Sequence, residues 1–187
     1  NFIFLLGVLC SVYLIVSVIY EVATYKKNFF VKQNFSRLFS HLGFGLLILA
    51  ITLNHFFSRE ITAKMHLGES FFQQGIKINF LKSESNEENN YDELFGSYEV
   101  IKDNKTFILK PSIRKYKQPK QFTSETSIKN DGLSDVYIAM DYAGDPSTGI
   151  GVRFYYNYSV RLIWISFALI TIGGIVSFVR RRNEKTI

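Results

Sequence analysis

The chain has 187 residues, of which 47% are hydrophobic and 16% are aromatic, and it carries a formal net charge of +6. Its single cysteine, Cys10, excludes an internal disulfide and a cysteine-type metal centre, and we interpret it as a small packing residue. Nine basic and two acidic residues lie outside 58–158, against 13 basic and 14 acidic residues within it. The positive charge therefore flanks the apolar segments and does not indicate a nucleic-acid-binding surface.

Three apolar blocks contain no Asp, Glu, Lys or Arg, and they are Phe2–Tyr20, Leu38–Phe57 and Leu162–Val179. About 20 helical residues, rising ~1.5 Å each, cross a hydrocarbon core of ~30 Å. We therefore predict three transmembrane helices. The first block lacks the basic start and small-residue cleavage site of a signal peptide. Because the chain begins at Asn1 and is apolar from there, we expect it to be the C-terminal piece of a longer membrane protein.

The placement of basic residues predicts the orientation of these helices. The aromatic and basic loop Tyr25–Arg37 and the tail with Arg180–Arg182 are expected to face the cytoplasm or the mitochondrial matrix. The segment between the second and third helices then faces the opposite side. The expected domains are two helices with an inner loop at 1–57, an extramembrane domain at 58–158, and a helix with a basic tail at 159–187.

The extramembrane segment shows alternating apolar and polar residues, which is typical of half-buried strands. The clearest cases are Ile76–Phe80, Thr106–Ile113, Val136–Met140 and Val152–Tyr156. Turn residues separate them at Asp103–Asn104, Asn130–Gly132 and Gly144–Gly149. The polar and acidic segment Ser83–Asp92 is expected to be an exposed loop. The fold class that we predict is therefore membrane α-helical, with an inserted, mostly-β domain that forms a small barrel or sandwich.

His41 is the main candidate for a functional residue, because an ionisable side chain inside a membrane span is costly and rare. A neutral imidazole at such a place often serves as an axial ligand to haem iron. The alternative is a structural hydrogen bond between helices. Gly43 and Gly45 follow closely, and their missing side chains either leave room for a flat porphyrin or allow close helix packing.

The other histidines carry weaker hypotheses. His55 follows His41 by 14 residues, about 21 Å along the same helix face, so the pair could serve two stacked haems. It also fits a polar residue at the membrane interface. His66 is expected to be a surface or strand residue.

Two other patterns concern helix packing and charge. The third apolar block contains the small residues Gly173, Gly174 and Ser177, which let helices approach closely. The basic run Arg114–Lys117 fits either an acidic partner or a solvent-facing strand and turn. No hydrolase, metalloprotease, nucleotide-binding or dinucleotide-binding motif is present in the sequence.

Several stretches together resemble the C-terminal part of the CcmF family of cytochrome c-type biogenesis proteins, which are haem lyase subunits. The order and spacing of the resembling stretches agree over about Ser36–Arg182. They are Ser40–Gly43, Leu67–Ser70, Thr123–Ile128 followed by Asp135–Ile138, and Val152–Tyr156 leading through Val160–Trp164 to Gly173–Ser177.

The resemblance implies that His41 is one axial ligand of a membrane b-type haem (haem b), with the opposite histidine on an upstream helix of the same protein. It implies electron transfer, possible use of quinol, and partnership with apocytochrome c and with haem-chaperone and apocytochrome-handling subunits. The implied location is the bacterial inner membrane with a periplasmic domain, or the mitochondrial inner membrane. The fragment alone is not expected to be catalytic.

Two other classes of function fit the residues. One is a membrane-anchored scaffold or interaction protein without haem, in which His41 is structural. The other is a di-haem b-type electron carrier that uses both His41 and His55. Loss of one of two haems on substitution of His55 would indicate the second class.

Overall fold

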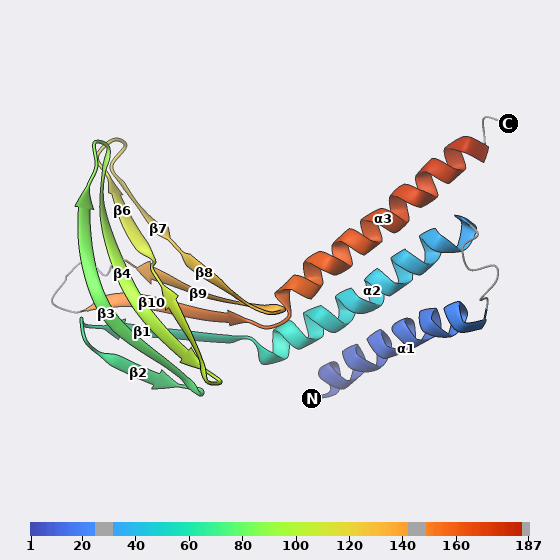
Figure 1. Ribbon diagram of the computed structural model, residues 1–187, viewed down its shortest axis with the longest axis horizontal. Helices are drawn as coiled ribbons and strands as arrows, with labels where there is room; N and C mark the ends of the chain where they lie inside the picture. The colour runs from blue at the N-terminus through green and yellow to red at the C-terminus, as the bar shows by residue number, and fades with distance from the viewer. Residues whose placement is uncertain (25–31, 142–148, 185–187) are drawn as a thin grey trace. The chain divides into compact units, whose positions relative to one another are not determined.

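The computed structural model describes residues 1–24, 32–141 and 149–184. It divides the chain into two compact units. One unit contains Asn1–Ser58 together with Tyr158–Ile187, and the other contains Arg59–Asn157. The first unit is helical and the second is built of strands (Figure 1).

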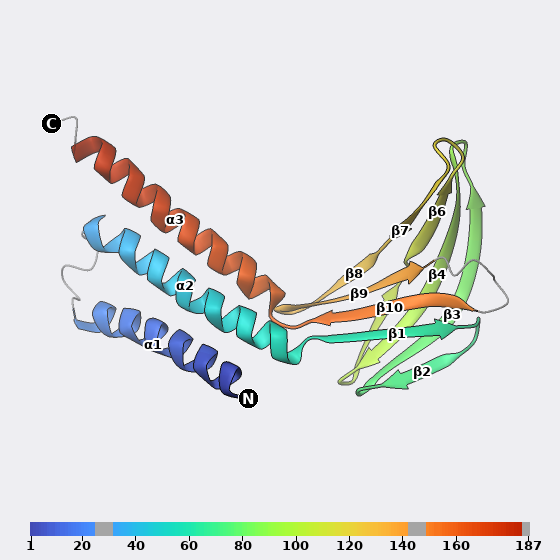
Figure 2. The same cartoon turned by 180° about the vertical axis from the view of Figure 1, so that it is seen from behind.

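The helical unit contains α1 (Phe2–Thr24), α2 (Lys32–Phe57) and α3 (Val160–Glu184). All three are long and apolar enough to cross a membrane, so the three predicted spans are confirmed. The helices lie in one layer with α2 between α1 and α3 (Figures 1 and 2). This chain is therefore a membrane protein with an inserted β domain.

The predicted inner loop Tyr25–Arg37 is wrong in its second half, because α2 already begins at Lys32. Hydropathy marks only the part of a helix that lies in hydrocarbon, whereas a polar turn can continue the same hydrogen-bonded helix into the interface. Arg37 forms an ion pair with Glu21 of α1, which stabilises this polar end. Residues 25–31, with the aromatic and basic part of the loop, lie outside the described residues.

The β unit consists of two antiparallel sheets. Sheet A has the order β1-β10-β9-β8. Its strands are β1 (Arg59–Met65), β8 (Ser127–Asp131), β9 (Ser134–Asp141) and β10 (Ile150–Asn157). Sheet B has the order β2-β3-β4-β6-β7, and β5 also pairs with β4. Its strands are β2 (Ser70–Gln73), β3 (Ile76–Glu87), β4 (Tyr91–Lys102), β5 (Lys105–Leu109), β6 (Ser112–Tyr116) and β7 (Gln121–Glu125).

Alternate residues of the two sheets meet in one hydrophobic core, which makes the domain a sandwich. In sheet B the rings of Phe80 and Tyr98 stack with centroids 4.5 Å apart. Gly96 is needed beside them, because a Cβ there would lie 2.5 Å from Cε2 of Tyr98 and 2.8 Å from Sδ of Met140. At this point of β4, core side chains therefore pack directly against the backbone of Gly96.

The predicted strands at Ile76–Phe80, Val136–Met140 and Val152–Tyr156 are confirmed. The turn predicted at Asp103–Asn104 is also confirmed, with φ of +48° and +61° at its two residues. A turn follows Asp131, at Gly132, as the segment Asn130–Gly132 predicts. Most of the predicted turn at Gly144–Gly149 lies outside the described residues.

Two predictions within the β unit are wrong. Ser83–Asp92 is not a loop, because β3 continues to Glu87 and β4 begins at Tyr91. This hairpin has polar side chains, so it lacks the apolar alternation that marks a strand in sequence. Thr106–Ile113 is not one strand but parts of β5 and β6, which are separated at Pro111. Proline has no N–H for a strand ladder, which explains the break.

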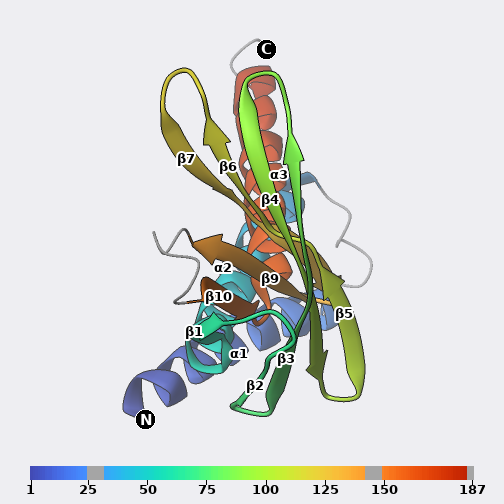
Figure 3. The same cartoon turned by 90° about the vertical axis from the view of Figure 1, so that its left-hand side faces the viewer.

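The tips of the β3–β4 and β6–β7 hairpins lie side by side (Figures 1 and 3). Lys117 joins them, since its Nζ lies 3.2 Å from Glu87 Oε1 and 3.3 Å from Asp92 Oδ1. Strands β1, β2, β4, β7 and β8 are additional to those that the sequence analysis predicts.

We expect Tyr98→Phe to stabilise the sandwich. Tyr98 is fully buried, and its hydroxyl has no hydrogen-bond partner among the described residues. Removing an unpaired buried hydroxyl should raise the free energy of unfolding by about 1–2 kcal/mol. The matched control is Tyr156→Phe, which loses the 3.3 Å hydrogen bond from its hydroxyl to Asp131 Oδ2 and should lower that free energy. Pulse proteolysis of the full-length protein in urea measures both.

The same pair of variants has a pH signature. Burial raises the pKa of Tyr98 above its ordinary value of about 10. The folded state therefore keeps the phenol neutral while the unfolded state ionises, so stability should fall as the pH rises above about 10. Tyr98→Phe should weaken this dependence. An unchanged slope, or a loss of stability in Tyr98→Phe equal to that of Tyr156→Phe, would contradict the assignment.

Candidate functional site

His41 lies on the face of α2 that neither α1 nor α3 covers. Its side chain is exposed, as is that of His55, and Phe44 and Ile51 are each 52% exposed. At about 100° per residue, these four positions fall within one quarter of the helix circumference. The imidazole of His41 is therefore available to a group that approaches from outside the three-helix layer, across an otherwise apolar surface.

The turn that precedes His41 is held closely against α3. Ser36 Oγ donates a 2.7 Å hydrogen bond to the backbone oxygen of Gly173. A Cβ on Gly173 would lie 2.8 Å from the backbone oxygen of Ser36 and 2.9 Å from the backbone nitrogen of Ser40, and it would collide with Ser40 Oγ. Only glycine fits at this contact.

Gly43 and Gly45 face the neighbouring helices. A Cβ on Gly43 would lie 2.8 Å from Cγ1 of Ile170 and 2.9 Å from the backbone oxygen of Ser166, both in α3. A Cβ on Gly45 would lie 3.0 Å from Cγ1 of Ile15 in α1. These contacts support the alternative of close helix packing for both glycines over that of room for a porphyrin.

The small residues of α3 differ in how closely they approach other helices. The close approach predicted for Gly173 is confirmed, whereas a Cβ on its neighbour Gly174 would meet none of the described residues within 4 Å. Successive helical residues point in directions about 100° apart, so Gly174 does not face α2, and its predicted close approach to another helix stays a prediction. The role of Ser177 stays a prediction.

The opposite side of α2 packs on α1 in the same manner. A Cβ on Gly7 would collide with Oγ1 of Thr52 and lie 3.1 Å from its Cγ2. Thr52 is 11 residues after His41, about 16 Å along the helix. Together with the ion pair between Glu21 and Arg37, this contact joins α1 and α2 near both of their ends.

The donor set suits a haem ligand better than a chelated metal ion. Within residues 1–24, 32–141 and 149–184, no group of three or more His, Cys, Asp and Glu could hold a metal ion. His41 offers one imidazole beside apolar side chains, which matches the demand of an axial position on a porphyrin. Among the described residues, His41 therefore offers a single imidazole at this place.

His66 is exposed directly after β1, as predicted, and its backbone N–H donates to Glu69 Oε2 at 2.7 Å. This hydrogen bond belongs to the turn between β1 and β2. His66 therefore serves as a surface reference for the two membrane histidines.

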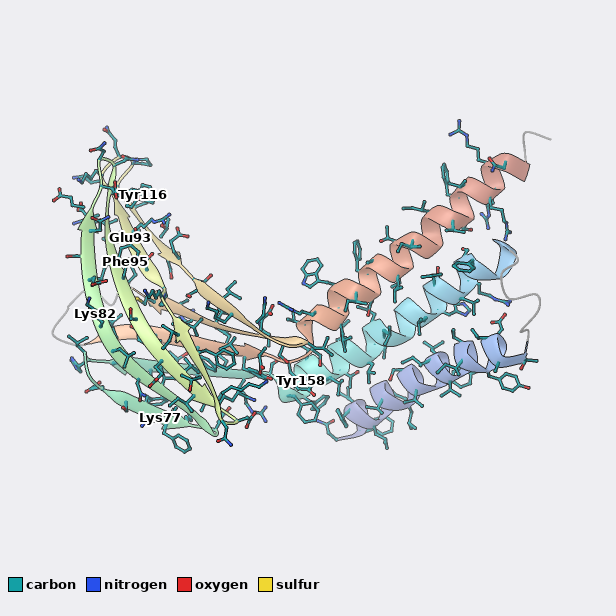
Figure 4. The ribbon with its side chains drawn as sticks, viewed as in Figure 1. Lys77, Lys82, Glu93, Phe95, Tyr116 and Tyr158 are labelled. Atoms are coloured by element: carbon teal, nitrogen blue, oxygen red, sulfur yellow. The ribbon has the colours of Figure 1, made fainter. Side chains whose placement is uncertain are left out.

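The basic run Arg114–Lys117 lies in β6 and the turn after it. Arg114 Nε donates to Glu93 Oε1 at 2.8 Å, and this hydrogen bond raises the pKa of Arg114 above its ordinary value. Ser112 Oγ donates to the same carboxylate at 2.6 Å. Glu93 is only 6% exposed, so its buried charge is balanced by these two donors. Glu93 and Tyr116 lie along the same stretch of sheet B (Figure 4). The sequence did not point to Glu93, because only the strand register places it opposite Arg114.

A pocket of about 390 Å³ beside this turn has Lys115, Lys120 and Phe122 among its lining residues. Asp92 also lines it and pairs with Lys117, so opposite charges meet at this surface of the domain. The solvent-facing strand and turn explain the basic run, and an acidic partner stays a prediction.

Comparisons with known proteins agree on one family. The family model described as the CcmF C-terminal beta-sandwich matches residues 56–158. The cytochrome c-type biogenesis protein CycK of Bradyrhizobium diazoefficiens is 26% identical over 144 residues, which cover 76% of this chain and 22% of the relative. The cytochrome c-type biogenesis protein CcmF of Haemophilus influenzae is 25% identical over 189 residues, which cover 95% and 29%.

A solved structure of a protein named Cytochrome c Heme Lyase CcmF has the same fold, with a TM-score of 0.68 at 14% sequence identity. The match covers 89% of this chain and 28% of that chain. This chain therefore spans less than a third of the length of the relatives that it matches.

Proposed function

Because this chain belongs to the CcmF family, whose C-terminal beta-sandwich model it matches, we propose that it is the C-terminal part of a haem lyase that matures c-type cytochromes. Within it, His41 supplies one axial ligand to a b-type haem in the membrane. The observation that supports this most directly is the exposed imidazole on α2, on the same helix face as Phe44 and Ile51 and between two helix-packing faces.

The residues around His41 fit this role. Close packing on both sides fixes the α2 backbone, so the imidazole is presented from a rigid element. A haem iron held by two imidazoles has no open position and suits electron transfer. The second histidine belongs to another part of the full-length protein.

The electron-transfer site has a defined purpose in this proposal. It passes electrons, with quinol as the proposed donor, to the iron of the haem that is to be attached to apocytochrome c. Haem attachment itself takes place in parts of the full-length protein outside this chain. The partners proposed for the full-length protein are the haem-chaperone and apocytochrome-handling subunits of a cytochrome c maturation complex.

The β domain serves as a docking surface in this proposal. It faces the periplasm of a bacterial inner membrane, or the intermembrane space if the protein is mitochondrial, since the basic residues flank the other ends of the helices. Its described residues hold no cluster of metal-ligating side chains. Binding of partner subunits is therefore the proposed role of the domain.

We expect His41→Ala to abolish the low-spin b-type spectrum of the full-length protein, because the iron loses one of its two axial imidazoles. Reduced-minus-oxidised visible spectroscopy of the purified protein measures this. His66→Ala is the matched control and should leave the spectrum unchanged, since His66 lies on the surface of the β domain.

The outcome separates the two main hypotheses. A low-spin spectrum that persists in His41→Ala would exclude His41 as the ligand. A haem-free protein with full maturation activity in His41→Asn would leave this chain as a membrane-anchored scaffold.

The exposure of His55 on the same face as His41 favours a second candidate, a di-haem electron carrier. The two positions are about 21 Å apart along α2. We expect the full-length protein to contain one b-type haem whether or not His55 is replaced by alanine, because His55 lies in the last turn of α2, where a polar side chain can reach the membrane interface. Pyridine haemochrome analysis counts the haems, and a fall from two to one in His55→Ala would establish the di-haem carrier.

The β domain can be removed cleanly to test its separate role. The backbone N–H of Tyr158 donates to Ser58 Oγ at 3.0 Å, so a short Gly-Ser linker can replace Arg59–Asn157. We expect this variant to keep the b-type spectrum and to lose co-purification with partner subunits. Loss of the spectrum with retained partners would reverse the assignment of the two units.

A further inference from the structure

The contact between α2 and Gly173 involves backbone atoms of the turn that ends at His41. The backbone oxygen of Ser36 and the backbone nitrogen of Ser40 are four residues apart, which is the spacing of an α-helical hydrogen bond. A Cβ on Gly173 would lie 2.8 and 2.9 Å from these two atoms. Gly173 therefore packs directly over one backbone hydrogen bond of α2, one residue before His41.

A side-chain hydrogen bond joins the same turns. Ser36 Oγ donates to the backbone oxygen of Gly173 at 2.7 Å. Ser36, Ser40 and Gly173 thus form a two-part contact, which we name the α2–α3 clamp. Rotation of α2 about its axis would break the hydrogen bond and press Ser40 against α3, so the clamp limits this rotation.

We propose that the α2–α3 clamp positions the imidazole of His41 toward the haem iron, so that α3 sets the strength of the axial ligand without touching the haem. This inference rests on the proposed haem-ligand role of His41. The three clamp residues are positioning residues, because they act through the backbone of α2. Neighbours of a ligating histidine that fix its orientation commonly tune the metal.

The chain provides controls that separate positioning from general packing. Gly174 follows Gly173 in sequence, and a Cβ there would meet no described residue of this chain within 4 Å. Gly7 makes an equally close contact with Thr52 at the other end of α2, about 16 Å along the helix from His41. Gly174→Ala tests the substitution itself, and Gly7→Ala tests a packing defect far from the ligand.

The experiment compares these variants in the full-length, haem-containing protein. Visible spectra, low-temperature EPR of the ferric state and redox titration are recorded for Gly173→Ala, Ser36→Ala, Gly174→Ala and Gly7→Ala. We expect Gly173→Ala to convert part of the haem from low-spin to high-spin and to shift the midpoint potential. Ser36→Ala removes only the hydrogen bond and should shift the EPR g-values and the potential in the same direction, by a smaller amount.

Gly174→Ala and Gly7→Ala are expected to match the unmodified protein. The inference is overturned if Gly173→Ala and Ser36→Ala leave the spectra and potential unchanged, or if Gly7→Ala changes them as much as Gly173→Ala does. If Gly173→Ala does not fold, Ser36→Ala still decides the question, because it adds no volume.

His41→Ala in the same series separates this inference from the proposed function. If His41→Ala keeps the low-spin spectrum, the haem-ligand role itself fails. If it loses that spectrum while both clamp variants behave as Gly174→Ala does, the ligand role stands and only the clamp fails.

Discussion

The helical unit depends on the close approach of α2 to α3, which only small residues permit. Inside hydrocarbon, lipid tails compete equally for apolar side chains, so helices associate through backbone proximity, van der Waals packing and a few hydrogen bonds. Gly43 and Gly173 provide that proximity from opposite helices, and the Ser36 hydroxyl adds a hydrogen bond at the same place. The position of His41 follows from these contacts, because it lies between Ser40 and Gly43 in sequence.

The β unit is stabilised mainly by the hydrophobic effect, because folding removes the apolar side chains of its core from water. Alternate residues of both sheets bury one continuous apolar cluster, and the unpaired hydroxyl of Tyr98 is accepted within it. Toward the tip of the β3–β4 hairpin the side chains are polar instead, and nearby the Glu93 carboxylate accepts hydrogen bonds from Ser112 and Arg114. Charge pairing and hydrogen bonds thus supplement apolar burial at this end of sheet B.

Features that depend on local composition could be predicted from the sequence, and features that depend on pairing could not. The three spans followed from hydropathy, whereas the cost of an imidazole in hydrocarbon marked His41 only as a candidate. The continuation of β3 and β4 through Ser83–Asp92 could not be predicted, because this polar segment is held as strands by the hydrogen bonds between β3 and β4. Likewise, residues 173 and 174 are both glycine, and only the structure shows that Gly173 is the one that contacts α2.

The middle position of α2 explains how one helix can be rigid and still present a reactive side chain. A helix at the edge of the layer has one packed face, so its rotation is resisted from one side only. α2 has packed faces toward both α1 and α3, through Gly45 and Gly43, while the histidine face is left uncovered. The ligand role proposed for His41 needs a fixed direction and an accessible ring nitrogen, and α2 offers both a closely packed backbone and an exposed histidine.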